Sequence, residues 1–239
     1  MNGLIEDVAI LKKLGLTPLL VHGGGLGIKK KSEELNIKNK FIMGLRVTDN
    51  KMIKIVEEVM IKFNKEIVRA LDKKSCKARS VTIKENNAIY VEQENKKLGF
   101  VGKPKKIEIN ILEDMITKGF VPIITPMGLD FKGQAYNINA DIAAGALARS
   151  LRSRRLLVVT DVEGVLDKNN KLITEINTAQ TKKMINDGTI RGGMIPKIKT
   201  CINAINHGVR GVVIIDGRKP HSILFELFSD QGAGTLIRK

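Results

Sequence analysis

The sequence contains no tryptophan, only 4% aromatic residues, two cysteines and three histidines among its 239 residues. Proteins that bind single-stranded nucleic acids stack bases on aromatic side chains, so this scarcity argues against nucleic acid as a partner. Cys76 and Cys201 lie far apart, form no Cys-x-x-Cys pair and have few histidines with which to complete a metal site. We therefore expect both cysteines to be reduced packing residues, and we predict no protein-bound metal.

Long apolar runs are also missing. No stretch approaches the roughly 18 to 20 consecutive apolar residues that a membrane helix requires. The N-terminal segment contains Glu6 and Asp7, where a secretory signal would be basic and then apolar. The prediction is a cytoplasmic protein without a membrane partner, and a plastid location stays open if an N-terminal extension precedes Met1.

The remaining composition is that of a globular protein with a strong positive charge. Hydrophobic residues make up 43% and charged residues 28%, which is enough apolar material for one large domain or two smaller lobes. The formal net charge is +16, and the lysines are scattered apart from short runs such as 29–31. A solvated lysine-rich surface explains this charge, and binding of anionic small ligands is the other interpretation.

Helical and strand patterns alternate along the chain. Apolar residues recur at helical spacing in 3–14, and a buried strand is predicted at 16–22. Short alternating segments in 80–103 predict antiparallel hairpins. Strands that alternate with helices favour a mainly parallel sheet with helices on both faces, so the predicted fold class is α/β. The further predicted helices are 26–36, 50–71, 108–118, 140–151, 178–187, 196–207 and 220–228, and the further strands are 41–47, 121–125, 156–160 and 210–215, with a hinge at 152–155.

Three consecutive glycines, Gly23, Gly24 and Gly25, lie between the first predicted strand and a helix. Their backbone N–H groups suit a phosphate or a carboxylate at a helix N-terminus. Neither the Walker spacing nor G-x-G-x-x-G is present, so the standard nucleotide fingerprints do not apply. A tight turn that packs the strand against the helix is the alternative explanation, and the glycines alone do not decide between the two.

Polar residues in two further segments of the N-terminal half are candidates for ligand binding. Arg46 lies within an otherwise apolar strand, where a guanidinium can bind a carboxylate through two hydrogen bonds; a surface ion pair is the alternative. Asn137, Asn139 and Asp141 crowd the start of a predicted helix. Asp141 could simply cap that helix, but two asparagines and an aspartate are more than one cap requires.

The C-terminal half has its own pair of loops. Gly164 follows a buried strand and permits a close turn against a flat ligand or phosphates. Gly192, Gly193 and Pro196 precede Lys197, which suggests a rigid turn that presents an ammonium group from the first turn of a helix. Open α/β sheets place their ligands at the carboxyl ends of strands, and the candidate loops occupy such positions.

Seven motifs, in order along nearly the whole chain, resemble the acetylglutamate kinases of the amino-acid kinase family. They are VHGGG, GLRVTD, GFVGKP, YNINADIAAGALA, TDVEGVL, GGMIPKI and IIDGRKPHSILFELFSDQGAGTLI. The resemblance implies a three-layer α/β sandwich with a mainly parallel central sheet. It also implies an N-terminal lobe, 1–153, for acetylglutamate binding and dimerisation, and a C-terminal lobe, 154–239, for ATP binding.

The reaction that the resemblance implies is transfer of the γ-phosphoryl group of MgATP to the side-chain carboxylate of N-acetyl-L-glutamate, a step toward arginine. Arg46 would bind the α-carboxylate, Asp141 would organise the catalytic lysines, and Lys197 would neutralise charge as the phosphoryl group leaves ADP. The other residues implied in acetylglutamate binding are Gly24, Gly25, Asn137 and Asn139. The residues implied in nucleotide binding are Thr160, Asp161, Val162, Gly164, Val165, Leu166, Ile190, Gly193 and Met194, with Mg²⁺ held mainly by the nucleotide phosphates.

The sequence differs from the family pattern at its start. Family members begin with a strand that ends in Lys-x-Gly-Gly and supplies a catalytic lysine, and Met1–Gly3 falls where that strand has already passed. Two interpretations stay open: a working kinase whose true start lies upstream of Met1, or an impaired homologue that binds nucleotide or acts as a regulatory subunit. Another carboxylate or carbamate kinase of the family is a further alternative. The family pattern also implies a homodimer or larger homo-oligomer, and residues 225–234 resemble arginine-inhibited members.

Overall fold

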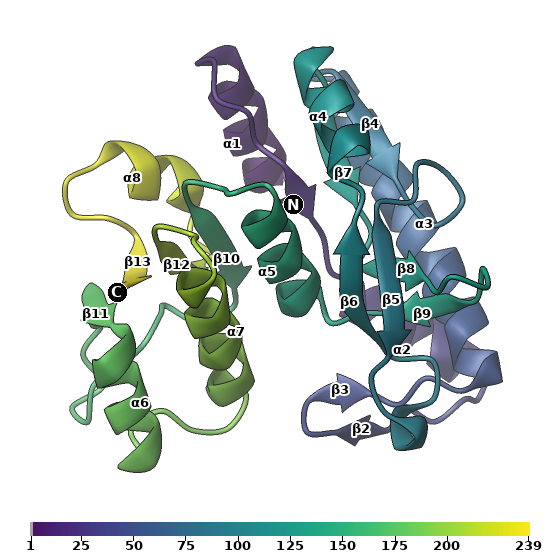
Figure 1. The fold of residues 1–239 in the computed structure, drawn as a ribbon. Helices are drawn as coiled ribbons and strands as arrows, with labels where there is room; N and C mark the ends of the chain where they lie inside the picture. The colour runs from purple at the N-terminus through teal and green to yellow at the C-terminus, as the bar shows by residue number, and fades with distance from the viewer. Residues whose placement is uncertain (1) are drawn as a thin grey trace. The chain divides into compact units, whose positions relative to one another are not determined.

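In the computed structural model, which describes residues 2–239, the chain folds as an α/β protein (Figure 1). Contacts within the chain divide it into two units. Unit 1 contains Gly145–Lys239 and the described residues up to Asp7, and unit 2 is Val8–Ala144. The division lies within helix α5 (Ala140–Ser150), before the basic cluster that was predicted as a hinge. No helix in residues 2–239 is long and apolar enough to cross a membrane.

Unit 2 contains a short parallel sheet in the order β1-β7-β4. Strands β1 (Leu20–Val21) and β4 (Ala78–Val81) both pair in parallel with β7 (Val121–Ile124). The strand predicted at 16–22 is therefore real but shorter than its apolar run, because only its last residues pair with β7. Parallel pairing brings the carboxyl ends of the three strands to one edge of the sheet, where the glycine-rich loop begins.

Helix α3 (Asn50–Asp72) packs against β4 and β7 and confirms the long amphipathic helix predicted from the sequence. It begins at a side-chain cap, since Asp49 Oδ1 accepts hydrogen bonds from the backbone N–H groups of Lys51 and Met52, at 3.0 and 2.8 Å. The buried face of α3 contributes Val56 and Met60 to an apolar cluster that also contains Ile28 of α2 (Gly25–Glu34). The start of α2, and with it the glycine-rich loop that leads into this helix, thus packs against α3.

A second sheet of unit 2 has the strand order β6-β5-β8-β9. Strands β5 (Ile89–Gln93) and β6 (Gly102–Ile107) form an antiparallel hairpin, as predicted within 80–103. The first segment of that region behaves differently, because β4 joins the parallel sheet instead of a hairpin. Strands β8 (Met127–Leu129) and β9 (Ala135–Asn137) were not predicted; they are three residues long and give too short a pattern.

The single strand predicted at 41–47 is instead a small hairpin. Strands β2 (Phe41–Ile42) and β3 (Leu45–Arg46) pair in antiparallel fashion. The chain reverses at Met43 and Gly44, which both have positive φ, of 49° and 80°. Glycine adopts this conformation without strain, and the turn interrupts what looked like one apolar run. The hairpin matters for function because Arg46 ends it.

Unit 1 is built on a four-stranded sheet in the order β10-β12-β13-β11. Strand β10 (Leu156–Thr160) pairs in parallel with β12 (Val212–Asp216) over five residue pairs, and β13 (Gly234–Arg238) runs antiparallel to β12. Strand β11 (Glu175–Asn177) pairs in parallel with β13. The predicted α/β class with parallel pairing is confirmed, but within residues 2–239 the strands form separate sheets in the two units instead of one central sheet.

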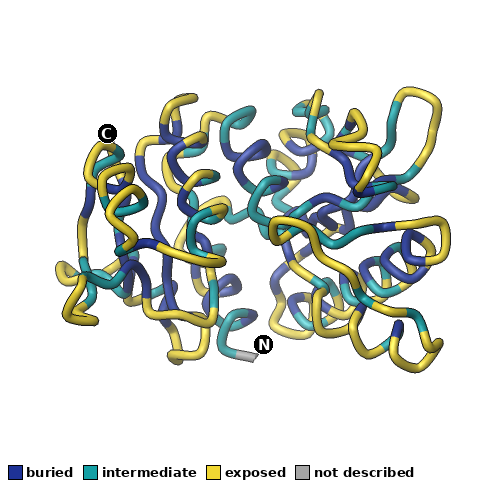
Figure 2. The backbone as a smooth tube through the Cα atoms, turned by 90° about the horizontal axis from the view of Figure 1, so that it is seen from below, coloured by how far each residue is buried: buried dark blue, intermediate teal, exposed yellow. Residues whose placement is uncertain are grey.

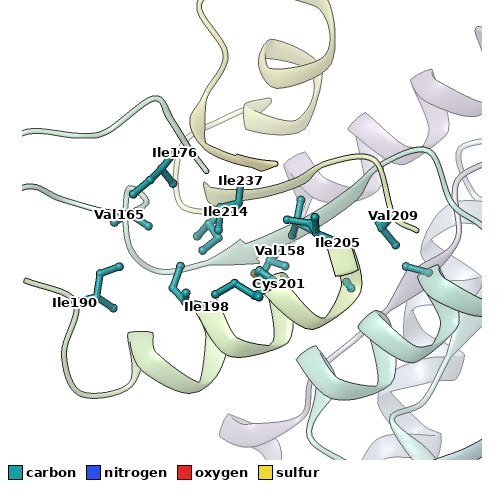
Figure 3. Close-up of a cluster of buried hydrophobic side chains, with 14 residues drawn as sticks. Val158, Val165, Ile176, Ile190, Ile198, Cys201, Ile205, Val209, Ile214 and Ile237 are labelled. Atoms are coloured by element: carbon teal, nitrogen blue, oxygen red, sulfur yellow. The ribbon is translucent and has the colours of Figure 1, made fainter. Parts of the chain in front are cut away.

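Helix α7 (Met194–Asn206) covers this sheet with an apolar core (Figure 3). Ile198, Cys201 and Ile205 point from α7 toward Val158 of β10 and Ile214 of β12. In Figure 2 the buried backbone lies in the interior of each unit and the connecting loops are exposed. The remaining helices are α1 (Asn2–Lys13), the short 3-10 helix η1 (Lys96–Leu98), α4 (Ile109–Thr117), α6 (Thr178–Asn186) and α8 (Ser222–Phe228).

Candidate active site

The three glycines after β1 differ in what surrounds them. A Cβ atom on Gly24 would lie 2.6 Å from the sulfur of Met60, so glycine permits the close packing against α3, and a larger residue would displace the end of the Met60 side chain. Gly23 and Gly25 have no atom within 4 Å of the position that a Cβ would take. The packing explanation therefore accounts for Gly24 alone. The open space at the other two leaves their backbone accessible, and Gly24, the N-cap of α2, offers no side-chain cap that would compete with a ligand for the first N–H groups of the helix.

His22 anchors the start of this loop, a role that the sequence pattern did not reveal. The residue is buried, and its ring atoms Nδ1 and Nε2 lie 3.0 Å from the carbonyl oxygen of Gly23 and 3.1 Å from Asn64 Nδ2. Asn64 Nδ2 also donates to the Ile123 carbonyl at 2.8 Å. A carbonyl can only accept, so the neutral ring donates from Nδ1 to Gly23 and accepts at Nε2. Burial lowers the pKa of His22, which favours this neutral form.

This network has a measurable pH signature. The pKa of His22 is 6.5 in its ordinary state and lower in the folded protein, so below that pH the unfolded chain takes up a proton that the folded chain does not. Stability from His22 is present above the unfolded pKa and is lost as the pH falls. We expect His22→Gln to cost about 1 kcal/mol near pH 7.5 and less near pH 5.5, as measured by urea unfolding. The control is the exposed His207→Gln; an equal cost for His22→Gln at both pH values would contradict the assignment.

Arg46, at the end of β3, carries an unsatisfied cationic group. Its guanidinium lies 4.7 Å from the centre of the Phe41 ring, on the other strand of the hairpin. The Nη1 atom is buried and has no hydrogen-bond partner. Burial also lowers the pKa of Arg46. A buried donor without an acceptor is costly, and a carboxylate ligand would satisfy it through the two-pronged geometry that guanidinium groups favour.

Thr48 connects Arg46 to Asn137, another residue implied in acetylglutamate binding. The hydroxyl of Thr48 donates to the Arg46 carbonyl at 2.9 Å and accepts from Asn137 Nδ2 at 3.3 Å. Residues that are 91 positions apart in sequence therefore belong to one hydrogen-bonded group. Asn139 caps α5, because its Oδ1 accepts a hydrogen bond from the Ile142 N–H at 3.1 Å. Asp141 follows in the first turn of that helix, half-buried.

In unit 1, the ends of β10 and β12 lie side by side. Thr160 is the register partner of Asp216, and its carbonyl accepts from the Gly217 N–H at 2.7 Å. Asp216 receives two hydrogen bonds from the Arg218 guanidinium, at 2.9 and 2.8 Å, and one from its backbone at 2.9 Å. These bonds lower the pKa of Asp216 to about 2, so the carboxylate stays ionised at neutral pH. The two residues after Thr160, Asp161 and Val162, are exposed, and the hydrogen bonds to Asp216, together with the negative charge of Asp161, raise the pKa of Arg218.

Gly164 forms a close turn, as predicted, but the contact is with protein. Its φ is +145°, and an added Cβ would lie 2.5 Å from Thr235 Oγ1. That hydroxyl also accepts from the Val165 N–H at 2.8 Å. Val165 and Ile190 are buried in the core of unit 1, and Leu166 bridges to Leu172. Val165 and Ile190 can therefore contribute to a nucleotide site only through their backbone groups, or indirectly, because their side chains pack beneath the surface loops.

Lys197 lies in the first turn of α7, four residues after its N-cap Gly193. Gly193 provides no side-chain cap, and Gly192 before it has a φ of +59°. Lys197 is half-buried, whereas Gly193 is exposed and Met194 is half-buried. The helix terminus and the ammonium group both carry positive charge, which suits the phosphates of a nucleotide. Within residues 2–239 there is no group of three or more His, Cys, Asp and Glu side chains that could bind a metal ion.

Comparison with known proteins identifies the class to which this fold and these loops belong. The model of the amino acid kinase family matches residues 1–216. The chain therefore belongs to the amino acid kinase family, as its motifs predicted.

Within the family, the chain is similar to acetylglutamate kinases. It is 57% identical over 235 residues to acetylglutamate kinase from Pelagibacter ubique, a match that covers 98% of this chain and 82% of that protein. It is 43% identical over 248 residues to acetylglutamate kinase from Nitrobacter winogradskyi, which covers 98% of this chain and 83% of the relative.

Solved structures give the same fold. The structure of smu.665 from Streptococcus mutans UA159 matches 98% of this chain and 91% of its own with a TM-score of 0.85 and 27% identity. N-acetylglutamate synthase from Neisseria gonorrhoeae matches all of this chain and 55% of its own with a TM-score of 0.90. At 22% identity, the second similarity bears on the fold alone.

Proposed function

We propose that this chain is an acetylglutamate kinase that transfers the γ-phosphoryl group of ATP to the side-chain carboxylate of N-acetyl-L-glutamate. The names of relatives that are up to 57% identical over nearly the whole chain support this activity, and with it a place in arginine biosynthesis. The observation in the chain itself that carries the proposal is the buried Nη1 atom of Arg46, which has no acceptor. A substrate carboxylate supplies the acceptor that the fold leaves out.

The proposed reaction needs alignment and charge stabilisation but no covalent intermediate. The side-chain carboxylate of acetylglutamate is ionised at neutral pH, so no base is required. One of its oxygens forms a bond to the γ-phosphorus while the bond from that phosphorus to the β,γ-bridging oxygen breaks, which gives an acyl phosphate and ADP. Arg46 and Asn137 fix the far end of the substrate, and the N–H groups of Gly24 and Gly25 receive the reacting carboxylate and the phosphoryl group.

The remaining proposed roles divide between the two units. In unit 1, Lys197 stabilises the negative charge that develops on the bridging oxygen, and the loops after β10 and before α7 bind ATP. In unit 2, Asn139 and Asp141 act from the start of α5. Asn139 shapes the substrate site, and Asp141 organises the catalytic lysines. The proposed nucleotide site consists of Thr160, Asp161, Val162, Gly164, Val165, Leu166, Ile190, Gly193 and Met194.

Several finer assignments stay predictions. As the family resemblance implies, we assign Mg²⁺ mainly to the phosphates of ATP and derive no step through a protein-bound metal. A homodimer or larger homo-oligomer and a cytoplasmic location also remain predictions. A measurement of the native mass in solution tests the first of these.

Trapping of the acyl phosphate with hydroxylamine tests the activity directly. The chain is incubated with ATP, Mg²⁺ and a carboxylate acceptor, and the hydroxamate is measured by its iron complex. We expect hydroxamate with N-acetyl-L-glutamate and much less with free glutamate or an aminoadipate derivative. A folded, ATP-binding protein that produces no hydroxamate from any of these acceptors would overturn the proposal and favour a nucleotide-binding homologue.

A further inference from the structure

Thr48 is a fully buried residue whose polar groups are all engaged. Its N–H donates to the Leu98 carbonyl at 2.9 Å, and its carbonyl accepts from the Phe100 N–H at 2.7 Å. Its hydroxyl makes the two bonds described above, to the Arg46 carbonyl and from Asn137 Nδ2. Three separate segments of unit 2, the end of β3, the loop around residues 98–100 and strand β9, therefore meet at this one residue.

The backbone of Thr48 is immobilised independently of its side chain. Gly99 forms a parallel bridge with Thr48 and has a φ of +69°. A Cβ on Gly99 would collide with the Thr48 carbonyl oxygen, so only glycine permits this close approach. The Phe100 carbonyl in turn accepts from the Asn137 backbone N–H at 2.9 Å. A change confined to the Thr48 hydroxyl should thus leave the backbone of Thr48 itself in place.

The hydroxyl also determines which end of the Asn137 amide faces a ligand. A hydroxyl has one proton, and the Arg46 carbonyl can only accept, so the proton of Thr48 goes to Arg46. The oxygen of Thr48 is then an acceptor, and Asn137 must present Nδ2 to it. This leaves Oδ1 as the acceptor end of the amide and prevents the flip that a free asparagine side chain undergoes. The backbone that carries Arg46 is fixed by the same hydroxyl.

We propose that Thr48 is a positioning residue of the acetylglutamate site, which sets the placement of Arg46 and the orientation of the Asn137 amide through one hydroxyl group. The proposal rests on the proposed function for the identity of the ligand but not for the geometry, which belongs to the ligand-free protein. Thr48 touches no substrate in this scheme. Its effect appears in acetylglutamate affinity, with ATP affinity unchanged, because every contact it makes lies within unit 2.

Isosteric substitution provides the test. Thr48→Val keeps the shape and removes both hydroxyl bonds, whereas Thr48→Ser keeps the hydroxyl and removes only a methyl group. We expect calorimetry to give an acetylglutamate Kd about tenfold higher for Thr48→Val, and within about twofold of the parent for Thr48→Ser. The Kd for ATP should be unchanged in both. Equal affinities in the parent and Thr48→Val would overturn the proposal, as would an equal loss in Thr48→Ser.

A double-mutant cycle separates positioning from general damage. If Thr48 acts through Asn137, the loss caused by Thr48→Val must shrink when Asn137 is already alanine. Full additivity of the two substitutions would contradict the coupling. Circular dichroism and the thermal midpoint of each variant serve as checks that the fold is retained.

A ligand-independent measurement distinguishes failure of this inference from failure of the proposed function. The side-chain amide resonances of Asn137 can be recorded by ¹H–¹⁵N NMR in the free protein. We expect them to shift in Thr48→Val and to stay near the parent position in Thr48→Ser. Unmoved resonances in Thr48→Val would refute the positioning role even in a protein that binds no acetylglutamate. A shift without any acetylglutamate binding would refute the proposed substrate and retain the geometry.

Discussion

Replacement of Lys197 by methionine is expected to lower kcat by about 10²- to 10³-fold. Methionine keeps an unbranched side chain of similar length but removes the charge that stabilises the bridging oxygen as its bond to phosphorus breaks. The loss falls on the chemical step, so the Kd for acetylglutamate should stay within about threefold of the parent value. The rate is measured by hydroxamate formation at saturating concentrations of both substrates, and the affinity by calorimetry.

Lys199→Met is the matched control for this substitution. Lys199 lies on the same helix and is exposed, and two residues along α7 turn it by about 200° to another face. Both variants lose one positive charge from the same helix, so a nonspecific effect of net charge would lower both rates equally. A Lys197→Met variant that keeps more than about a tenth of the parent kcat would contradict the catalytic assignment. Lys197→Arg, which keeps the charge but moves it, should have an intermediate rate.

Much of the fold could be predicted because its helices have strong periodicity and its buried strands are bounded by glycines. Helix α3 and the parallel pair β10 and β12 illustrate this, since each pattern extends over several residues. The short strands β8 and β9 were missed for the opposite reason. The region 41–47 was misassigned because its turn, at Met43 and Gly44, lies inside an apolar run, and Met43, whose φ is 49°, is a residue with no turn preference.

The candidate site could be predicted only in part. Arg46 was singled out because a charged group within an apolar strand is unusual, Asn137 because two asparagines and an aspartate crowd the start of a helix, and Gly24 because it belongs to a run. His22 and Thr48 were missed, since one histidine and one threonine carry no spacing signal. Their roles depend on partners far away in sequence: Asn64 for His22, and Asn137 for Thr48. Such contacts arise from the tertiary fold, and a single sequence does not encode them in a local pattern.

Arg46→Lys is expected to raise the Kd for acetylglutamate by about 10²-fold and to leave the Kd for ATP unchanged. Lysine keeps the positive charge but provides a point charge on a flexible stem, in place of the planar fork that binds both carboxylate oxygens. It also loses the stacking of the guanidinium over Phe41. Calorimetric titration of each ligand into the parent and variant proteins measures both affinities.

The chain offers a close control in Arg79→Lys. Arg79 also lies in a short strand of unit 2, and its guanidinium lies 4.5 Å from the centre of the Phe120 ring, but the residue is exposed. Loss of stacking alone would therefore affect both variants, and only Arg46→Lys should weaken acetylglutamate binding. If Arg79→Lys weakens that binding as much, the carboxylate assignment of Arg46 is wrong.

Stability provides the argument against a purely structural role for Arg46. When an arginine forms an internal ion pair, its replacement by an uncharged residue lowers the protein's free energy of unfolding, because the partner is left without a counter-charge. Arg46 instead has a buried Nη1 atom without a partner in the ligand-free protein, so its replacement removes an unsatisfied group. Urea unfolding without ligand should give Arg46→Met, which removes both the charge and the donors, a stability within about 0.5 kcal/mol of the parent, or above it. Saturating acetylglutamate should then stabilise the parent by more than the variant, because only the parent satisfies the guanidinium on binding. A large loss of stability in the ligand-free variant would instead favour the ion-pair interpretation that the sequence alone left open.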